Sequence, residues 1–327
     1  MQKGFLFVAM GILVAVGASA RSTRAQTATV NEPYDPNVSY DCDRACLTGF
    51  IDQYLTALVA HDPSRLPLAR DVKFTEDDQV MKLGDGLWGT ASGLGSYKIY
   101  AADPETGEVM FMGVVKENGA SVILGLRLRI QTKKIMEIEQ MVDRSTPGRV
   151  VHADALADNP DFNETLAPPD RRSRQNMIAI ANIYYSAIEK NAGTMAVPFD
   201  KSCVRIENGN QTTSNPKLRP NAAPGALNVA AMSCEEQIRL GAWKEDSWLR
   251  DRRFIVDQDK GLVFVFSFWD HNATLRSWQL TDGRTRNASR TGPWTWESLA
   301  LFSIKDGLIR RVEAIVNEVP YGMKPGW

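Results

Sequence analysis

The residue types best suited to catalysis in this chain are two glutamates and one histidine. Glu76 and Glu207 occupy matching places in two short segments, Phe74-Thr75-Glu76-Asp77 and Arg205-Ile206-Glu207-Asn208. A carboxylate that points into an apolar pocket can act as a general base, because burial favours uptake of a proton. We expect each glutamate to be catalytic if it points inward, and to be a solvated carboxylate at a strand end if it points outward.

The histidine candidate, His271, follows an apolar run over residues 262–269. Strand alternation places His271 on the same face as Ser267 and Trp269. An imidazole at the rim of such a face titrates near neutral pH and can carry protons. The alternative is a loop histidine beside the glycosylation acceptor at Asn272.

Three aromatic residues and one arginine are candidates for binding a substrate. Trp88 and Trp243 each follow a glycine in matching Gly-x-Trp segments, and Tyr97 could donate a hydrogen bond near the first of them. Each aromatic ring could line a pocket for a ring-bearing ligand, or fill the core. Arg253 ends the charged run 250–253 and could hold a carboxylate of the ligand, or form salt bridges at a solvated edge.

Both glutamates and both tryptophans belong to a pattern that the chain repeats. Two further pairs of segments also match, the turns at residues 103–109 and 257–263 and the closing segments at 135–139 and 309–313. Four matched pairs therefore recur in the same order along the chain. The period is far longer than that of a solenoid repeat. The pattern therefore predicts an internal duplication of one domain, with Asp103 and Asp257 capping the matched turns.

The elements of each copy follow from hydrophobic spacing. The first copy shows a helical pattern over 42–61 and then strands at 72–74, 97–101, 109–115, 122–130 and 135–142. The second shows a helix over 174–190 and strands at 262–269, 299–304 and 308–316. We predict an α+β protein of two cone-shaped domains, each with a helix packed on a curved, mostly antiparallel sheet. The expected boundaries are a signal peptide at 1–25, a first domain at 40–145, a linker at 146–171 and a second domain at 172–327.

This order of elements resembles the nuclear transport factor 2-like superfamily, which includes ketosteroid isomerases and polyketide cyclases. The features that carry the resemblance are Tyr54-x-x-x-Leu58 before His61-Asp62-Pro63, then Val72-Lys73-Phe74, and a last strand ending in Ile138-Glu139. The resemblance implies a pocket between the helix and the concave face of the sheet, and chemistry without a metal or organic cofactor. It also implies that the two sheets pack against each other.

Composition narrows the compartment and the partners. The net charge is −1, so no overall field recruits nucleic acid. Residues 5–16 form an apolar stretch of secretory-signal length behind Lys3, and the alternative to a signal peptide is an uncleaved N-terminal anchor. This stretch is short for a membrane span, and no other stretch approaches the necessary length. Cysteines and Asn-x-Ser/Thr sequons favour a secreted or periplasmic glycoprotein, with Cys203–Cys234 as one disulfide and Cys42–Cys46 as a second. The sequence does not decide between a monomer and a homo-oligomer.

We therefore expect a secreted, cofactor-free lyase, isomerase or cyclase of secondary metabolism. Its substrate would be a small apolar molecule, aromatic or polyketide-like, and its reaction proton transfer, elimination or retro-aldol cleavage. Glu207 or His271 would be the base, and Trp243 and Arg253 would position the ligand. The alternative is a module that binds a small molecule or a protein without turnover. No serine-hydrolase, phosphate-loop or dinucleotide motif is present in the sequence.

Overall fold

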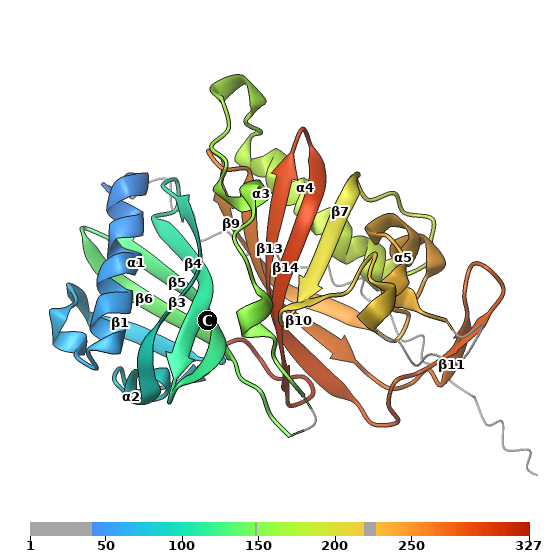
Figure 1. The fold of residues 1–327 in the computed structure, drawn as a ribbon, viewed down its shortest axis with the longest axis horizontal. Helices are drawn as coiled ribbons and strands as arrows, with labels where there is room; N and C mark the ends of the chain where they lie inside the picture. The colour runs from blue at the N-terminus through green and yellow to red at the C-terminus, as the bar shows by residue number, and fades with distance from the viewer. Residues whose placement is uncertain (1–40, 148, 219–226) are drawn as a thin grey trace, which may run out of the picture.

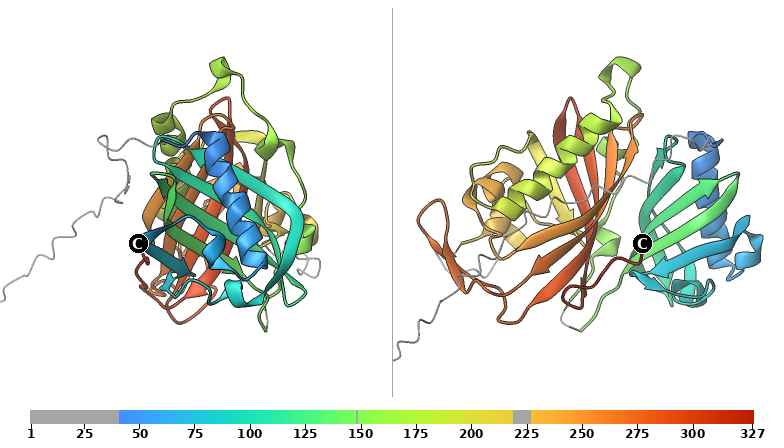
Figure 2. Two further views of the ribbon diagram at one scale, coloured as in Figure 1. Left: turned by 90° about the vertical axis from the view of Figure 1, so that its left-hand side faces the viewer. Right: turned by 180° about the vertical axis from the view of Figure 1, so that it is seen from behind.

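The computed structural model describes residues 41–147, 149–218 and 227–327, and shows two six-stranded sheets that each carry a long helix on one face (Figure 1). The two helices lie on the outer sides, and the sheets lie between them (Figure 2). The predicted α+β class with two helix-on-sheet units is confirmed. The expected signal peptide and the sequon at Asn37 lie outside the described residues.

The first unit begins with helix α1, Arg44–Val59, whose N-cap is Asp43. Its buried side chains include Leu47, Ile51, Tyr54 and Leu58, which recur at helical spacing and face the sheet. The other elements are η1 (Pro63–Arg65), β1 (Leu68–Glu76), β2 (Gln79–Val80), α2 (Leu87–Thr90), β3 (Ala91–Asp103), β4 (Glu108–Glu117), β5 (Ala120–Gln131) and β6 (Lys134–Asp143).

The second unit begins with helix α4, Arg174–Lys190, with the bounds that the spacing predicts. Asn191 ends this helix in the left-handed conformation, at φ 40°. The other elements are β7 (Phe199–Glu207), β8 (Asn210–Gln211), η4 (Pro216–Leu218), η5 (Val229–Ala231), α5 (Cys234–Leu240), β9 (Trp248–Asp257), β10 (Leu262–His271), β11 (Ser277–Gln279), β12 (Thr285–Asn287), β13 (Trp294–Lys305) and β14 (Leu308–Val319).

The two large sheets share one topology. Their strand orders are β2-β1-β6-β5-β4-β3 and β8-β7-β14-β13-β10-β9. In each sheet a single pair is parallel, β1 with β6 and β7 with β14, and the other pairs are antiparallel. Positions in one sheet can therefore be matched to positions in the other through their pairing registers.

The interface between the units is reciprocal. The carboxylate of Asp103 accepts a hydrogen bond from Val256 N, and that of Asp257 accepts one from Ala102 N, both at 3.0 Å. The first residue of each long helix completes the exchange, because Arg174 pairs with Asp103 and Arg44 with Asp257. Such a self-complementary contact is typical of a two-fold interface. The two aspartates, predicted as turn caps, thus reach across to the other unit, and Asp257 also accepts from Lys260 N in its own turn.

Apolar side chains fill the space between the sheets. Strand β10 is covered on both faces, with Val263 and Val265 in the core under α4 and Leu262 and Phe264 in the core between the sheets. Leu299 packs on Gly125 of the opposite sheet so closely that a side chain there would collide with it. The predicted packing of sheet on sheet is therefore confirmed.

Two segments pack more closely than their sequences indicate. The linker contains the elements η2 (Ala153–Ala155), α3 (Pro160–Asn163) and η3 (Pro168–Asp170), and it buries Phe162 completely. The C-terminal segment, expected to fold back on the second unit, crosses to the first, where Trp327 Nε1 donates to Thr75 Oγ1 at 3.0 Å. In the described part of the chain, no helix is both long and apolar enough to cross a membrane.

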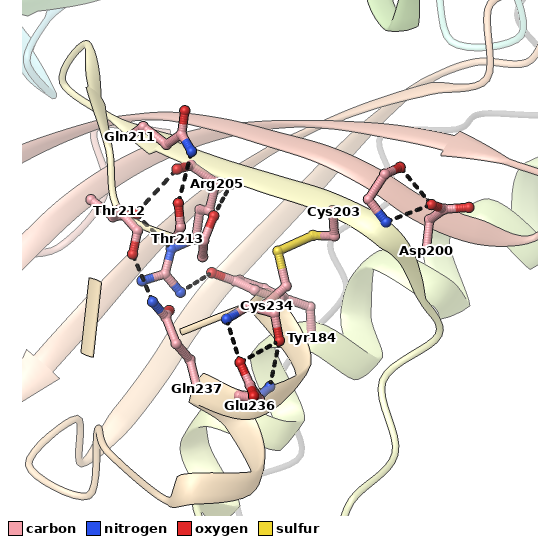
Figure 3. The surroundings of a disulfide bond; sticks show 12 residues. Tyr184, Asp200, Cys203, Arg205, Gln211, Thr212, Thr213, Cys234, Glu236 and Gln237 are labelled. Atoms are coloured by element: carbon pink, nitrogen blue, oxygen red, sulfur yellow. Dashed lines mark hydrogen bonds between the residues drawn. A yellow bond between two sulfur atoms is a disulfide. The ribbon is translucent and has the colours of Figure 1, made fainter. Parts of the chain in front are cut away.

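Both expected disulfides are present, Cys42–Cys46 and Cys203–Cys234. The second joins β7 to the start of α5 across a sequence separation of 31 residues (Figure 3). Replacing both Cys203 and Cys234 by serine is expected to lower the free energy of unfolding by about 2–4 kcal/mol, because the unfolded chain regains the entropy of that loop. Urea unfolding under oxidising conditions measures the loss. A double variant as stable as the wild type would contradict the expectation.

Candidate active site

A cavity of about 220 Å³ lies on the face of the second sheet that α4 covers. Tyr184 of α4 and residues of β7, β10, β13 and β14 line it. Most of its wall is apolar, and the polar side chains at its edge are Arg149, Arg205, Glu207, Asn208, Arg290 and Glu318. An apolar chamber with a few convergent polar groups is the usual form of a small-molecule site.

The cavity exists because the second sheet carries small residues where the first carries large ones. Ala300 pairs with Ala314 in the second sheet, and the matching pair in the first is Leu126 with Gln140. Ala314 and Gln140 are matched positions, because Ala314 pairs with Glu207 and Gln140 pairs with Glu76. The small side chains of Ala300 and Ala314 therefore leave space over the second sheet that larger side chains fill over the first.

The rim of the cavity shows the opposite substitution. Trp269 pairs with Trp296 in the second sheet, where the first sheet pairs Val115 with Val122. Both indole rings line the cavity and are half-buried. Small residues in the floor and two indoles at the rim make a slot that suits a flat, ring-bearing molecule.

The predicted base Glu207 lines this cavity and pairs with Arg205. Its Oε1 is 3.0 Å from Nε of Arg205, which is almost fully buried, while the Glu207 side chain is 36% exposed. The Arg205 guanidinium also reaches the Tyr184 hydroxyl at 3.4 Å (Figure 3). One carboxylate, one guanidinium and one phenol therefore converge on an apolar chamber.

Two contacts of its own side chain and a disulfide on the same strand hold Arg205 in this position. Its Nε donates to Thr212 Oγ1 at 3.1 Å, and its guanidinium lies 4.6 Å from the ring centre of Trp243. The disulfide at Cys203, two residues earlier on β7, anchors the same strand to α5 (Figure 3). Burial opposes the charge on Arg205, but Glu207 and Tyr184 outweigh it and raise its pKa above the ordinary value. Burial likewise raises the pKa of Tyr184, so the phenol stays protonated and can donate.

Trp243, predicted to bind substrate, stands behind Arg205 and outside the set of side chains that line the cavity. His271 likewise lies deeper than the cavity wall. Its ring is buried, stacks on Trp294 at 4.1 Å and meets the edge of the rim residue Trp296 at 4.6 Å. His271 Nε2 is 2.8 Å from a carboxylate oxygen of the buried Asp246, whose pKa is raised by burial although His271 opposes the rise. The pair supports the aromatic rim from behind.

In the first unit the matching residues form a closed hydrogen-bonded network. Trp88 Nε1 donates to Tyr54 OH, and that hydroxyl donates to Gln140 Oε1, both at 2.8 Å. Gln140 Nε2 donates to Glu76 Oε2 at 3.1 Å, and Arg144 pairs with the other oxygen at 2.8 Å. Trp88 and Tyr54 are fully buried. Glu76 and Trp88 thus join a core network in which their polar groups are already paired.

Two other predicted binding residues lie at the interface between the units. Tyr97 is buried among the side chains between the sheets, and its hydroxyl hydrogen-bonds to Glu313 of the second unit. Arg253 pairs with Glu139 of the first unit. Neither side chain lines the cavity described above, and both stabilise the packing of one sheet on the other.

The prediction omitted four of the residues that shape the site. Two of them, Tyr184 and Arg205, could have been found, since Arg205 shares a strand face with Glu207 and Tyr184 lies on the buried face of a helix. Asp246, in the turn after α5, and Arg149, in the linker, carried no such signal. Among the described residues, no group of three or more histidine, cysteine or acidic side chains could hold a metal ion.

One family model matches part of the chain. Residues 170–316 match the model of a Domain of unknown function (DUF8021). No curated protein matches the chain. Similar solved structures include PrhC from Penicillium brasilianum (15% identity, TM-score 0.26, 44% of this chain and 82% of that one) and a phenazine biosynthesis-related protein from Pseudomonas aeruginosa (10%, 0.23, 46% and 84%). A designed protein with a curved β-sheet is similar at 16% identity and a TM-score of 0.27, over 31% of this chain and 88% of its own. At these values the likenesses carry no functional argument.

Proposed function

We propose that the second domain is a cofactor-free enzyme that moves a proton on a small, apolar, ring-bearing molecule. The observation that carries this proposal is that Arg205 contacts both Glu207 and Tyr184 at a cavity whose wall is mostly apolar. The proposed class is lyase, isomerase or cyclase, and the substrate class is aromatic or polyketide-like. The nuclear transport factor 2-like resemblance of the sequence, together with the shared topology of the two sheets, supports the same class.

The proposed step is proton abstraction next to a carbonyl group. The Glu207 carboxylate takes the proton from carbon, and the electron pair of that bond moves onto the carbonyl oxygen. Arg205 and Tyr184 donate to this oxygen as it becomes an enolate, an interaction that is strong where water is excluded. Return of the proton to another carbon gives an isomer. Loss of a β-substituent gives an alkene, and attack of the enolate on a second carbonyl closes a ring.

The first domain, at residues 40–145, is proposed to be a structural partner that arose with the second by duplication. Leu126, Gln140 and Trp88 occupy the space that is open in the second domain, which we place at 172–327 after a linker at 146–171. The reciprocal contacts of Asp103 and Asp257 support a pairing like that of two subunits. The two disulfides and the exposed sequon residues Asn272 and Asn287 support the proposed secretion and glycosylation.

The test of this proposal introduces the larger side chains of the first domain at the matching alanines of the second domain. Ala300→Leu and Ala314→Gln are expected to abolish ligand binding and turnover while leaving stability unchanged or raised by about 0.5–2 kcal/mol, since they fill empty space. A thermal-shift screen with aromatic and polyketide-like compounds finds ligands of the wild type, and chromatography with mass detection follows their consumption. Ala231→Leu, at an exposed alanine outside the cavity, is the matched control.

Three outcomes separate the candidate functions. Consumption by the wild type and the control, but not by the filled variants, supports an enzyme whose site is this cavity. Binding without consumption in any form would favour the alternative, a small-molecule-binding module. Consumption that survives both filled variants would show that the reaction takes place elsewhere.

A further inference from the structure

A larger, polar space between the two domains lies next to the cavity of the second domain. This second space, which we call the vestibule, measures about 480 Å³. Three side chains line both spaces, namely Arg149, Arg290 and Glu318. Because the two spaces share these side chains, they adjoin, and a ligand that fills the cavity lies within reach of the vestibule.

The vestibule takes its walls from both domains and from the linker. The first domain contributes Asp77 and Arg144, the linker contributes Arg149, and the second domain contributes Arg290 and Glu318. Arginine outnumbers acid here. The negative side is weakened further because burial raises the pKa of Asp77 to about 7. The vestibule therefore favours an anionic group over a neutral or cationic one.

The two arginines that line both spaces are held firmly but differ in exposure. Arg149 donates to Asp143, to Val316 O at 2.6 Å and to Arg144 O at 3.0 Å, which fixes its guanidinium between the last strands of both domains. Arg290 pairs with Glu318 at 2.7 Å, and its side chain remains 47% exposed. Arg290 also lies 4.9 Å from the ring centre of Trp294. A planar guanidinium that is oriented by such contacts suits a planar carboxylate.

We infer that the ligand of this site has two parts, an apolar ring system that fills the cavity and a carboxylate that lies in the vestibule against Arg149 and Arg290. The inference rests on the proposed function for the location of the ring system. It adds the chemical class of the other end of the ligand. It also gives the two-domain architecture a role, because the linker arginine belongs to the site only while the domains are joined.

A matched pair of probes tests the inference on the full chain. The probes are 2-naphthoxyacetate and its neutral isostere 2-naphthoxyacetamide, with titration calorimetry as the measurement. The wild type is expected to bind the acid about tenfold more tightly than the amide, as one charge-assisted contact provides. Arg290→Gln is expected to remove most of that preference without changing the affinity for the amide. Arg149→Gln, confirmed as folded by circular dichroism, should do the same.

Two controls make the outcomes distinct. Arg284→Gln removes an exposed arginine that pairs with Asp282 away from both spaces, and it should keep the full preference for the acid. Ala300→Leu should lose both probes. Equal affinity for acid and amide, a preference that survives Arg290→Gln and Arg149→Gln, or failure of both probes to bind the wild type would overturn the inference. The proposed reaction is judged separately, by consumption of a ligand.

Discussion

Replacing Glu207 by glutamine is expected to slow turnover by about 10²–10⁴-fold while leaving ligand affinity close to that of the wild type. The amide has the size of the carboxylate and keeps an acceptor oxygen for Arg205, which lies 3.0 Å away. It cannot take up a proton at neutral pH. The turnover number of a ligand that the wild type consumes, compared with the affinity measured by calorimetry, separates the loss of a base from the loss of a binding contact.

Glu76→Gln is the matched control, because Glu76 holds the same place in the other sheet. Its carboxylate accepts from Leu87 N and Gln140 and pairs with Arg144, so the substitution should cost stability. It should not change the turnover of the folded protein. Turnover at the wild-type rate in Glu207→Gln would rule out this residue as the base. An equal loss in both variants would point to a structural effect that is shared by the two domains.

The repeated sequence pattern made part of this site predictable. Glu207 could be predicted as a site residue because its segment and the segment of Glu76 match and recur in the same order. Its side chain lines the cavity. The choice between the domains was not readable in that way. It depends on Ala300 and Ala314 facing each other where the first sheet has Leu126 and Gln140, and this contrast appears only when the pairing registers are known.

Of the seven predicted site residues, Glu207 is the one that lines the cavity. The positions of Tyr97, Arg253 and His271 depend on details of their strands. Tyr97 and Arg253 lie in strands whose registers shift nearby, between Leu94 and Lys98 in β3 and opposite Phe266 and Phe268 in β9. In β9 one extra residue puts Arg250 and Arg253 on the same face, so strict alternation fails there. Tyr97 lies within the irregular stretch of β3 itself. His271 does follow the alternation, but the strand extends beyond the cavity, and its ring packs behind the rim.

Replacing Arg127 by methionine is expected to lower the free energy of unfolding by about 3–5 kcal/mol, because it leaves carboxylates buried without a cation. The Arg127 side chain is 1% exposed, and it pairs with Glu108 at 2.9 Å, Glu137 at 2.8 Å and Glu139 at 2.7 Å. Glu139 also pairs with Arg253 of the second domain, so the cluster couples the core of the first domain to the interface.

Urea unfolding of Arg127→Met at pH 7 measures this cost, and Arg310→Met is the control. Arg310 pairs with Asp306 at the surface, where such a bridge contributes about 0–1 kcal/mol. Adding Glu108→Gln to Arg127→Met should restore part of the loss, because one buried negative charge disappears with the cation that balanced it. A loss below about 1 kcal/mol in Arg127→Met, or no recovery in the double variant, would mean that the carboxylates are neutralised in another way.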